Sequence, residues 1–242
     1  MFKSLFSYYG SKSKIIHNYP KPSYDTIVEP FAGSAAYSLR YCNRNIILKE
    51  LDYRVYSIWC FLLSSDALDI AHKYLDGLSV KAGDSIENIA QECPHPGFIE
   101  YLRAEANHGS QGTGKCGRKI ITMFGAKAWH RILPKLDYFI PKIKHWKIIN
   151  GTYEGLPNIE ATWFIDPPYD GVRGKEYRCN TVNYNNLGEW CKNRIGQVIV
   201  CENTMAQWLP FEPLCKTGSA AYKDKYRVAP VEAMFYIRYH NE

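Results

Sequence analysis

Short apolar segments alternate along this chain with stretches of helical spacing, and several of the apolar segments end at a carboxylate. Segments with the composition of strands lie at 24–30, 45–51, 146–150, 161–166, 197–202 and 232–239, and helical patterns at 34–42, 53–63 and 185–194. Alternating strands and helices predict a doubly wound α/β sheet. Because such sheets bind ligands beyond the carboxyl ends of their strands, Glu29, Glu50 and Asp166 mark the expected site.

The alternation is interrupted between the second and third of these strands. Residues 66–144 contain no convincing strand until late and have mainly helical or irregular patterns. A chain of 242 residues is long enough for one full domain with an inserted subdomain. We therefore expect a Rossmann-like domain formed by residues 1–65 and 146–242, with residues 66–145 as a mainly helical insert.

Composition indicates the cellular compartment of the chain and the state of its cysteines. No stretch of about 18 apolar residues predicts a membrane span, and the N-terminal apolar stretch is too short for a signal peptide. The eight cysteines are scattered singly, which favours reduced thiols in a cytosol over a zinc site or a disulfide scaffold. Cys93 lies near His95 in a sequence typical of a turn, and we expect no metal site.

Positive charge is concentrated in residues 115–147. This segment contains nine Lys and Arg residues against one acid, Asp137, so its net charge is +8, whereas the whole chain carries +6. Five aromatic residues are interleaved with these charges: Phe124, Trp129, Tyr138, Phe139 and Trp146. The pattern fits a nucleic-acid contact and, equally well, a solvated helix face whose aromatics belong to the core.

Within the insert, residues 109–116 (GSQGTGKC) match the spacing of a phosphate-binding loop. The residue that should hold magnesium is Cys116 instead of Ser or Thr, and a helical pattern precedes the loop where a strand is required. We interpret the segment as a glycine-rich basic loop near nucleic acid.

Two motifs at strand ends predict a nucleoside-like ligand. In EPFAGSAA, residues 29–36, small residues around Gly33 allow a ligand to approach the backbone and the start of the following helix. A tight strand–helix packing turn would explain this motif alone. Glu50 closes the next strand, where an acid accepts hydrogen bonds from ribose hydroxyls, and Asp52 is the competing candidate.

The third motif, WFIDPPYD at 163–170, places a carboxylate, two prolines and an aromatic ring at the end of an apolar strand. The prolines have no N–H to donate, so Asp166 and the prolyl carbonyls form a turn rich in acceptors. Such a turn suits an amino group, and Tyr169 offers a stacking face. An extruded nucleobase with an exocyclic amine meets both conditions. A proline-rich strand exit is the plainer alternative.

Taken in order, these motifs resemble the Dam-like family of N6-adenine DNA methyltransferases. The resemblance covers roughly residues 5–60 and 146–240 and includes YYGSKSK at 8–14, the 29–36 loop and the Asp166–Tyr169 tetrapeptide. Ser11 stands in place of a family glycine, and Ala35 occupies another position where glycine is frequent. The insert lacks the Asn-x-x-Gly hairpin pattern that we associate with readers of GATC, so the recognition sequence stays open.

The resemblance implies S-adenosylmethionine as cofactor and a flipped adenine in double-stranded DNA as target. The implied catalytic residues are Asp166, Pro167, Pro168 and Tyr169. The implied cofactor-binding residues are Tyr8, Lys12, Glu29, Phe31, Gly33, Ser34, Glu50 and Asp166. The implied DNA contacts are Lys115, Arg118, Lys119, Lys127 and Arg131.

In the implied mechanism Glu50 holds the cofactor ribose, and Tyr8 and Lys12 lie near its methionine end. Asp166 and the Pro167 carbonyl accept the two amino hydrogens while the base stacks on Tyr169, so positioning and electrostatics supply most of the catalysis. Methylation of cytosine N4 or of RNA adenine, or a silent nucleic-acid-binding protein, are the alternatives. Oligomeric state, with a monomer favoured, and the biological role in restriction protection, viral self-marking or regulation stay open.

Overall fold

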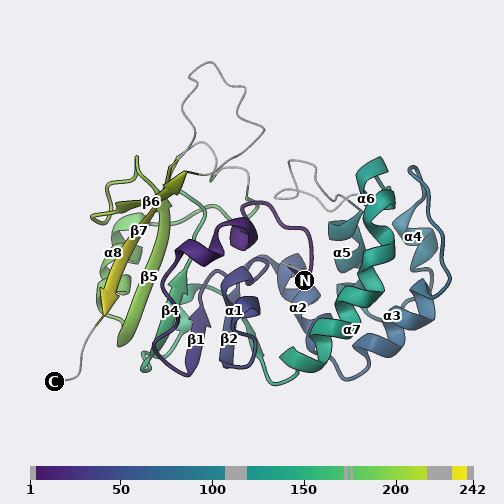
Figure 1. Ribbon diagram of the computed structural model, residues 1–242, viewed down its shortest axis with the longest axis horizontal. Coiled ribbons are helices and arrows are strands. Elements are labelled where there is room, and N and C mark those ends of the chain that lie inside the picture. Colours follow the sequence, from purple (N-terminus) through teal and green to yellow (C-terminus); the bar gives the residue numbers. More distant parts are fainter. Residues whose placement is uncertain (1–3, 107–118, 172–173, 175–176, 217–230, 239–242) are drawn as a thin grey trace, which may run out of the picture.

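The computed structural model describes residues 4–106, 119–171, 174, 177–216 and 231–238. Within these ranges no helix is long and apolar enough to cross a membrane. Figure 1 shows a sheet in one half of the molecule and a group of helices in the other. The segment 109–116 falls outside the described residues, and the helical pattern expected before it is present as α5, Pro96–Glu105.

The sheet has seven strands in the order β3-β2-β1-β4-β5-β7-β6. The strands from β3 through β5 pair in parallel, whereas β7 is antiparallel to both of its neighbours. This order, with one reversed strand next to the last position, is that of the Rossmann-like methyltransferase sheet, and the predicted fold class is confirmed. The bounds are β1 Thr26–Glu29, β2 Asn45–Glu50, β3 Lys147–Asn150, β4 Ala161–Ile165, β5 Gly196–Asn203, β6 Glu212–Lys216 and β7 Val231–Arg238.

Side chains of the central strands alternate between two hydrophobic clusters. Ile27 of β1 and Phe164 of β4 belong to one cluster, and their neighbours Val28 and Trp163 belong to the other. All five residues of β4 are buried. Burial on both faces explains why the strands of a parallel sheet appear as nearly continuous apolar runs in the sequence.

The helices flank this sheet and fill the insert. The first cluster packs against α1 (Ala36–Arg40) and α2 (Tyr53–Leu63), and the second against α8 (Tyr184–Lys192). Between β2 and β3 the chain also forms α3 Ala67–Leu75, α4 Ile86–Ile89, α5 Pro96–Glu105, α6 Met123–Ala128 and α7 Ile132–Ile143. Short 3-10 helices are η1 Lys12–Lys14, η2 Ile16–Asn18, η3 Trp129–Arg131 and η4 Tyr153–Gly155.

The buried Glu105 joins two helices of the region between β2 and β3 to each other and to the N-terminal segment. The Glu105 carboxylate on α5 accepts from Lys135 Nζ at 2.7 Å and from Ser7 N at 2.8 Å. Close by, the Tyr101 hydroxyl donates to the Leu5 carbonyl at 3.2 Å. Removing one partner of a buried pair leaves an uncompensated charge. The backbone just before Tyr8 is therefore held against the insert.

Candidate active site

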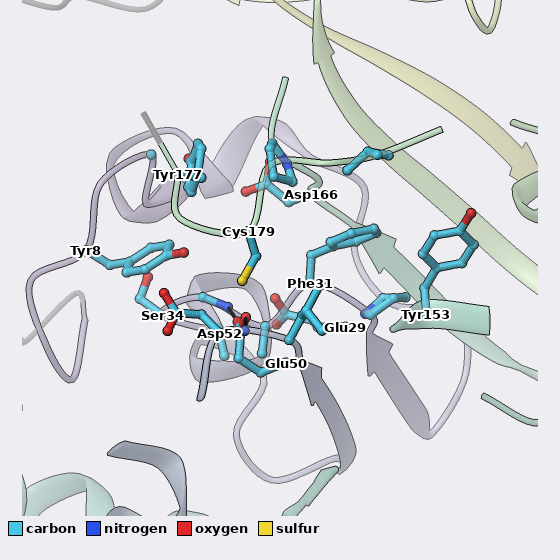
Figure 2. A pocket seen from close by; sticks show the side chains of 18 of the residues that line it. Tyr8, Glu29, Phe31, Ser34, Glu50, Asp52, Tyr153, Asp166, Tyr177 and Cys179 are labelled. Atoms are coloured by element: carbon cyan, nitrogen blue, oxygen red, sulfur yellow. Dashed lines mark hydrogen bonds between the residues drawn. The ribbon is translucent and has the colours of Figure 1, made fainter. Parts of the chain in front are cut away.

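One cavity lies at the carboxyl ends of β1, β2 and β4. It encloses about 910 Å³ of empty space including its open mouth. Three walls meet there: the loop at residues 29–36, here named the glycine loop, the turn at residues 166–169, named the acceptor turn, and residues 177–182. In Figure 2, Asp166 and Tyr177 lie on the opposite side of the cavity from Glu50 and Asp52, with the Cys179 side chain between them.

Gly33 is the tightest point of the glycine loop. Its φ of +46° favours glycine, and a Cβ added there would lie 2.7 Å from the Tyr8 ring. Its N–H donates to Glu50 Oε2 at 2.9 Å, and its carbonyl accepts from Trp59 Nε1 at 2.8 Å. Only a residue without a side chain fits between the loop and Tyr8.

Ser11 and Ala35, the two positions where this sequence departs from the Dam-like pattern, have different structural environments. Ala35 has φ 46° and ψ 46°, a left-handed conformation that costs a residue with a Cβ. That geometry explains why the position favours glycine. Ser11 is tied to the loop, since the Ser34 hydroxyl donates to Ser11 Oγ at 2.9 Å.

Buried carboxylates line the floor of the cavity. Besides Gly33 N, Glu50 accepts from Asp52 N at 2.8 Å, and Glu29 accepts from Ser38 N at 2.8 Å. Burial raises the pKa of Glu50 to about 7 and that of Glu29 to about 8, in each case against the opposing effect of these hydrogen bonds. Asp52 also lines the cavity and caps α2 through Arg54 N at 3.0 Å. Asp52, and Glu50 in its ionised form, suit a ligand that carries positive charge.

Lys12 holds the carboxylate of the acceptor turn. Its Nζ lies 2.7 Å and 3.0 Å from the two oxygens of Asp166 and 3.7 Å from Glu232 Oε1. Burial raises the pKa of Asp166 to about 6 although Lys12 opposes the shift. Burial lowers the pKa of Lys12, but the two carboxylates outweigh it and the net shift is upward. Lys12 therefore stays charged.

The other groups of the acceptor turn are held by side chains from later segments. The Tyr184 hydroxyl donates to the Pro168 carbonyl at 2.7 Å, and the Tyr169 hydroxyl donates to Glu232. Asp170 N donates to the buried Glu202 at 2.8 Å. Among the described residues none donates a hydrogen bond to the Pro167 carbonyl.

The structure brings most of the expected site residues to one cavity. Those that line it are Tyr8, Lys12, Glu29, Phe31, Gly33, Ser34, Glu50, Asp166 and Pro168. Pro167 and Tyr169 belong to the same turn but are not among the lining residues, and the Lys12 ammonium lies 4.6 Å from the centroid of the Tyr169 ring. One face of that ring is therefore covered.

Several lining or supporting residues were not predicted. Tyr177, Cys179 and Val182 line the cavity, and no motif in the sequence marks them. Glu202 and Glu232 support the acceptor turn from β5 and β7. Only their position as isolated acids in apolar strands could have drawn notice to them. In the described residues no group of three or more His, Cys, Asp or Glu side chains could hold a metal ion.

The basic segment divides into core and surface residues. Trp129, Phe139 and Trp146 are buried, as the core interpretation predicts, whereas Phe124 and Tyr138 are exposed. Lys119, Lys127 and Arg131 are exposed, and Lys115 and Arg118 lie outside the described residues. Phe124 and Lys127 both belong to α6, which lies toward the top of the view in Figure 1. An exposed aromatic thus stands among exposed cations.

The strand order defines a Rossmann-like methyltransferase fold, and its cavity occupies the ligand position of that fold. No protein-family model and no curated protein matches the chain. Two solved structures of the rRNA methyltransferase AviRa from Streptomyces viridochromogenes are similar, with 11% and 12% identity and TM-scores of 0.37 and 0.39. The alignments cover 87% and 89% of this chain and 76% and 79% of AviRa. The assignment of the methyltransferase fold therefore rests on the strand order and on the position of the cavity.

Proposed function

We propose that this protein is an S-adenosylmethionine-dependent methyltransferase of the Dam-like type, which methylates N6 of a flipped adenine in DNA. One observation carries the proposal: the glycine loop and the acceptor turn line the same cavity of a methyltransferase sheet. Gly33 and Asp166, distant in sequence, meet at one ligand site. A ligand bound along the glycine loop would reach the acceptor turn.

The cavity fits the proposed cofactor by shape and by charge. Because Gly33 has no Cβ, the Tyr8 ring packs directly against the glycine loop, and both residues line the cavity. A carboxylate has about four lone-pair sites, and the two hydrogen bonds to Glu50 leave others for ribose hydroxyls. Asp52, which also lines the cavity, is an acid that suits a sulfonium or an ammonium group. When bound, the cofactor supplies an electrophilic methyl group.

The acceptor turn would bind the target amine through its two hydrogens. The Pro167 carbonyl accepts no hydrogen bond from a described residue, and Asp166 retains lone pairs beside those directed at Lys12. Gripping both N–H bonds fixes the nitrogen and directs its lone pair toward the cavity. Because Lys12 covers one face of Tyr169, a base would stack on the opposite face. Lys12 keeps Asp166 ionised and therefore able only to accept.

DNA is proposed as the partner because of the exposed surface on α6 and the residues next to it. Lys119, Lys127 and Arg131 are exposed, Phe124 is 59% exposed, and the sequence from 119 to 131 contains no acid. Phosphate contacts position a duplex, and an exposed aromatic adds stacking. These residues would act together with Lys115 and Arg118 of the same segment.

The salt dependence of binding tests this surface. We expect DNA affinity to fall about tenfold or more between 50 and 200 mM salt, because several phosphate contacts release counterions. Replacing both Lys127 and Arg131 by alanine should flatten the slope of log affinity against log salt. The double variant Lys192→Ala/Lys216→Ala, outside the insert, is the control. An unchanged slope in the Lys127/Arg131 variant would remove this surface from the proposal.

Mass spectrometry of nucleosides tests the activity itself. The protein is incubated with isotopically labelled S-adenosylmethionine and, in separate reactions, duplex DNA, single-stranded DNA and RNA of mixed sequence. The proposal predicts labelled N6-methyladenine in duplex DNA. Labelled N4-methylcytosine, or product in RNA alone, would replace the substrate assignment. No transfer in any reaction, together with no cofactor binding by calorimetry, would overturn the proposal.

A further inference from the structure

We propose that Glu232 is a positioning residue for methyl transfer, which holds the acceptor turn and Lys12 in place from β7, two strands away from β4 in the sheet. The inference rests on the proposed function and assigns a role to a residue outside every motif of the sequence. Glu232 is the second residue of β7, and its side chain is 7% exposed.

Side chains from three different segments of the chain contact this carboxylate. The Tyr19 hydroxyl donates to Glu232 Oε1 at 2.5 Å, the Tyr169 hydroxyl donates to the same oxygen, and Lys12 Nζ lies 3.7 Å away. A buried carboxylate is costly unless it is paired and hydrogen-bonded, and these contacts meet both conditions. Glu232 thus contacts two residues of the proposed site, Tyr169 and Lys12.

Glu232 fixes the acceptor turn at two points. Through the Tyr169 hydroxyl it fixes the rotation of the ring on which the base would stack. Through Lys12 it fixes the ammonium that grips both oxygens of Asp166. Lys12 lies between two carboxylates, so loss of the Glu232 charge would leave it with Asp166 as its one carboxylate partner among the described residues. Misplacing reacting groups by about 1 Å can cost about 100-fold in rate.

The positioning role of Glu232 predicts a measurable change in the pKa of Asp166, because that pKa depends on the surrounding charges. Lys12 on η1 lowers its pKa and Glu232 on β7 raises it, while burial raises it most. Other titratable groups that interact electrostatically with this cluster are Tyr8, Tyr19, Glu29, Tyr169, Tyr177, Cys201, Glu202 and Cys215. Removing the negative charge of Glu232 should therefore lower the pKa of Asp166. A residue that only stabilises the fold would not move that titration.

The test substitutes Glu232→Gln in the full-length protein and measures kcat, the KM for S-adenosylmethionine and the pH profile of kcat on duplex DNA. We expect kcat to fall about tenfold or more, the KM for the cofactor to stay within about threefold, and the acid limb of the profile to move to lower pH. The matched control is Glu212→Gln, an exposed glutamate on the neighbouring strand β6, which should leave all three unchanged.

A second variant covers the case in which Glu232→Gln fails to fold. Tyr169→Phe removes the same hydrogen bond from the other side and keeps the ring, so it should lower kcat several-fold without moving the acid limb. Wild-type kcat in a folded Glu232→Gln, or loss of kcat in it with an unmoved acid limb, would overturn the inference while leaving the proposed function intact. If Glu232→Gln does not fold, wild-type kcat in Tyr169→Phe would overturn it in the same way. Absence of methyl transfer by the wild-type protein would overturn both.

Discussion

The glycine loop and the acceptor turn face each other across one cavity, but different kinds of bonds hold them. Gly33 is held through its backbone by Glu50 and Trp59, which lie 17 and 26 residues further along the chain. Asp166 is held through its side chain by Lys12, 154 residues away. The glycine loop is a feature of local backbone geometry, whereas the acceptor turn is an assembly of distant side chains. The two walls should therefore respond differently to substitution.

The strongest test of the glycine loop is Gly33→Ala. The added Cβ combines a left-handed φ with an approach of 2.7 Å to the Tyr8 ring, so we expect S-adenosylmethionine affinity to fall about tenfold or more. Calorimetry measures the loss. Gly77→Ala is the control, because Gly77 has a similar φ of +67° and nothing within 4 Å of its added Cβ. Wild-type affinity in Gly33→Ala would show that the loop does not hold the cofactor.

Substitution of Glu29 tests the charge beneath the glycine loop. Its pKa is raised from 4.5 to about 8 by burial, so the folded state binds more protons and the free energy of unfolding falls as pH rises to about 8. Glu29→Gln resembles the protonated form and should lessen that fall between pH 6 and 9 by roughly 2–3 kcal/mol. Urea unfolding at both pH values measures it. Glu212→Gln should keep the wild-type dependence, and an equally steep dependence in Glu29→Gln would contradict the prediction.

A smaller effect is expected at Ala35, where the same loop carries strain. Replacement by glycine relieves the left-handed conformation, partly offset by greater freedom of the unfolded chain, and should raise the free energy of unfolding by about 1 kcal/mol. Ala36→Gly, at the first residue of α1, should instead lower it by roughly 0.5–1 kcal/mol. Chemical denaturation of both variants gives the comparison. Destabilisation of both by the same amount would argue against strain at Ala35.

The same contrast explains what the sequence could predict. The apolar runs at 24–30, 45–51 and 161–166 identified β1, β2 and β4, because strands buried on both faces leave a continuous signal. The strand β6 was missed, since Glu212–Lys216 is short, partly exposed and interrupted by Pro213. An edge strand of that kind carries little periodicity.

The site residues that stand at strand ends could be predicted from the sequence, whereas the long-range contacts between their side chains could not. Glu29, Gly33, Glu50 and Asp166 stand at strand ends, where parallel topology alone brings them together. The bond between Lys12 and Asp166 depends on how the N-terminal segment crosses the sheet, and the contact of Glu232 with Tyr169 depends on the antiparallel β7. No local pattern encodes either arrangement. Long-range side-chain contacts are what the structure adds.

The central claim is that Asp166 in the acceptor turn grips the target amine. The most direct measurement is single-turnover methyl transfer to duplex DNA by Asp166→Asn, with DNA and cofactor affinities measured on the same preparation. We predict a rate at least about 100-fold below wild type, DNA affinity within a few-fold, and wild-type rates for Asp170→Asn, an exposed neighbour. A wild-type rate of transfer in Asp166→Asn would contradict the account.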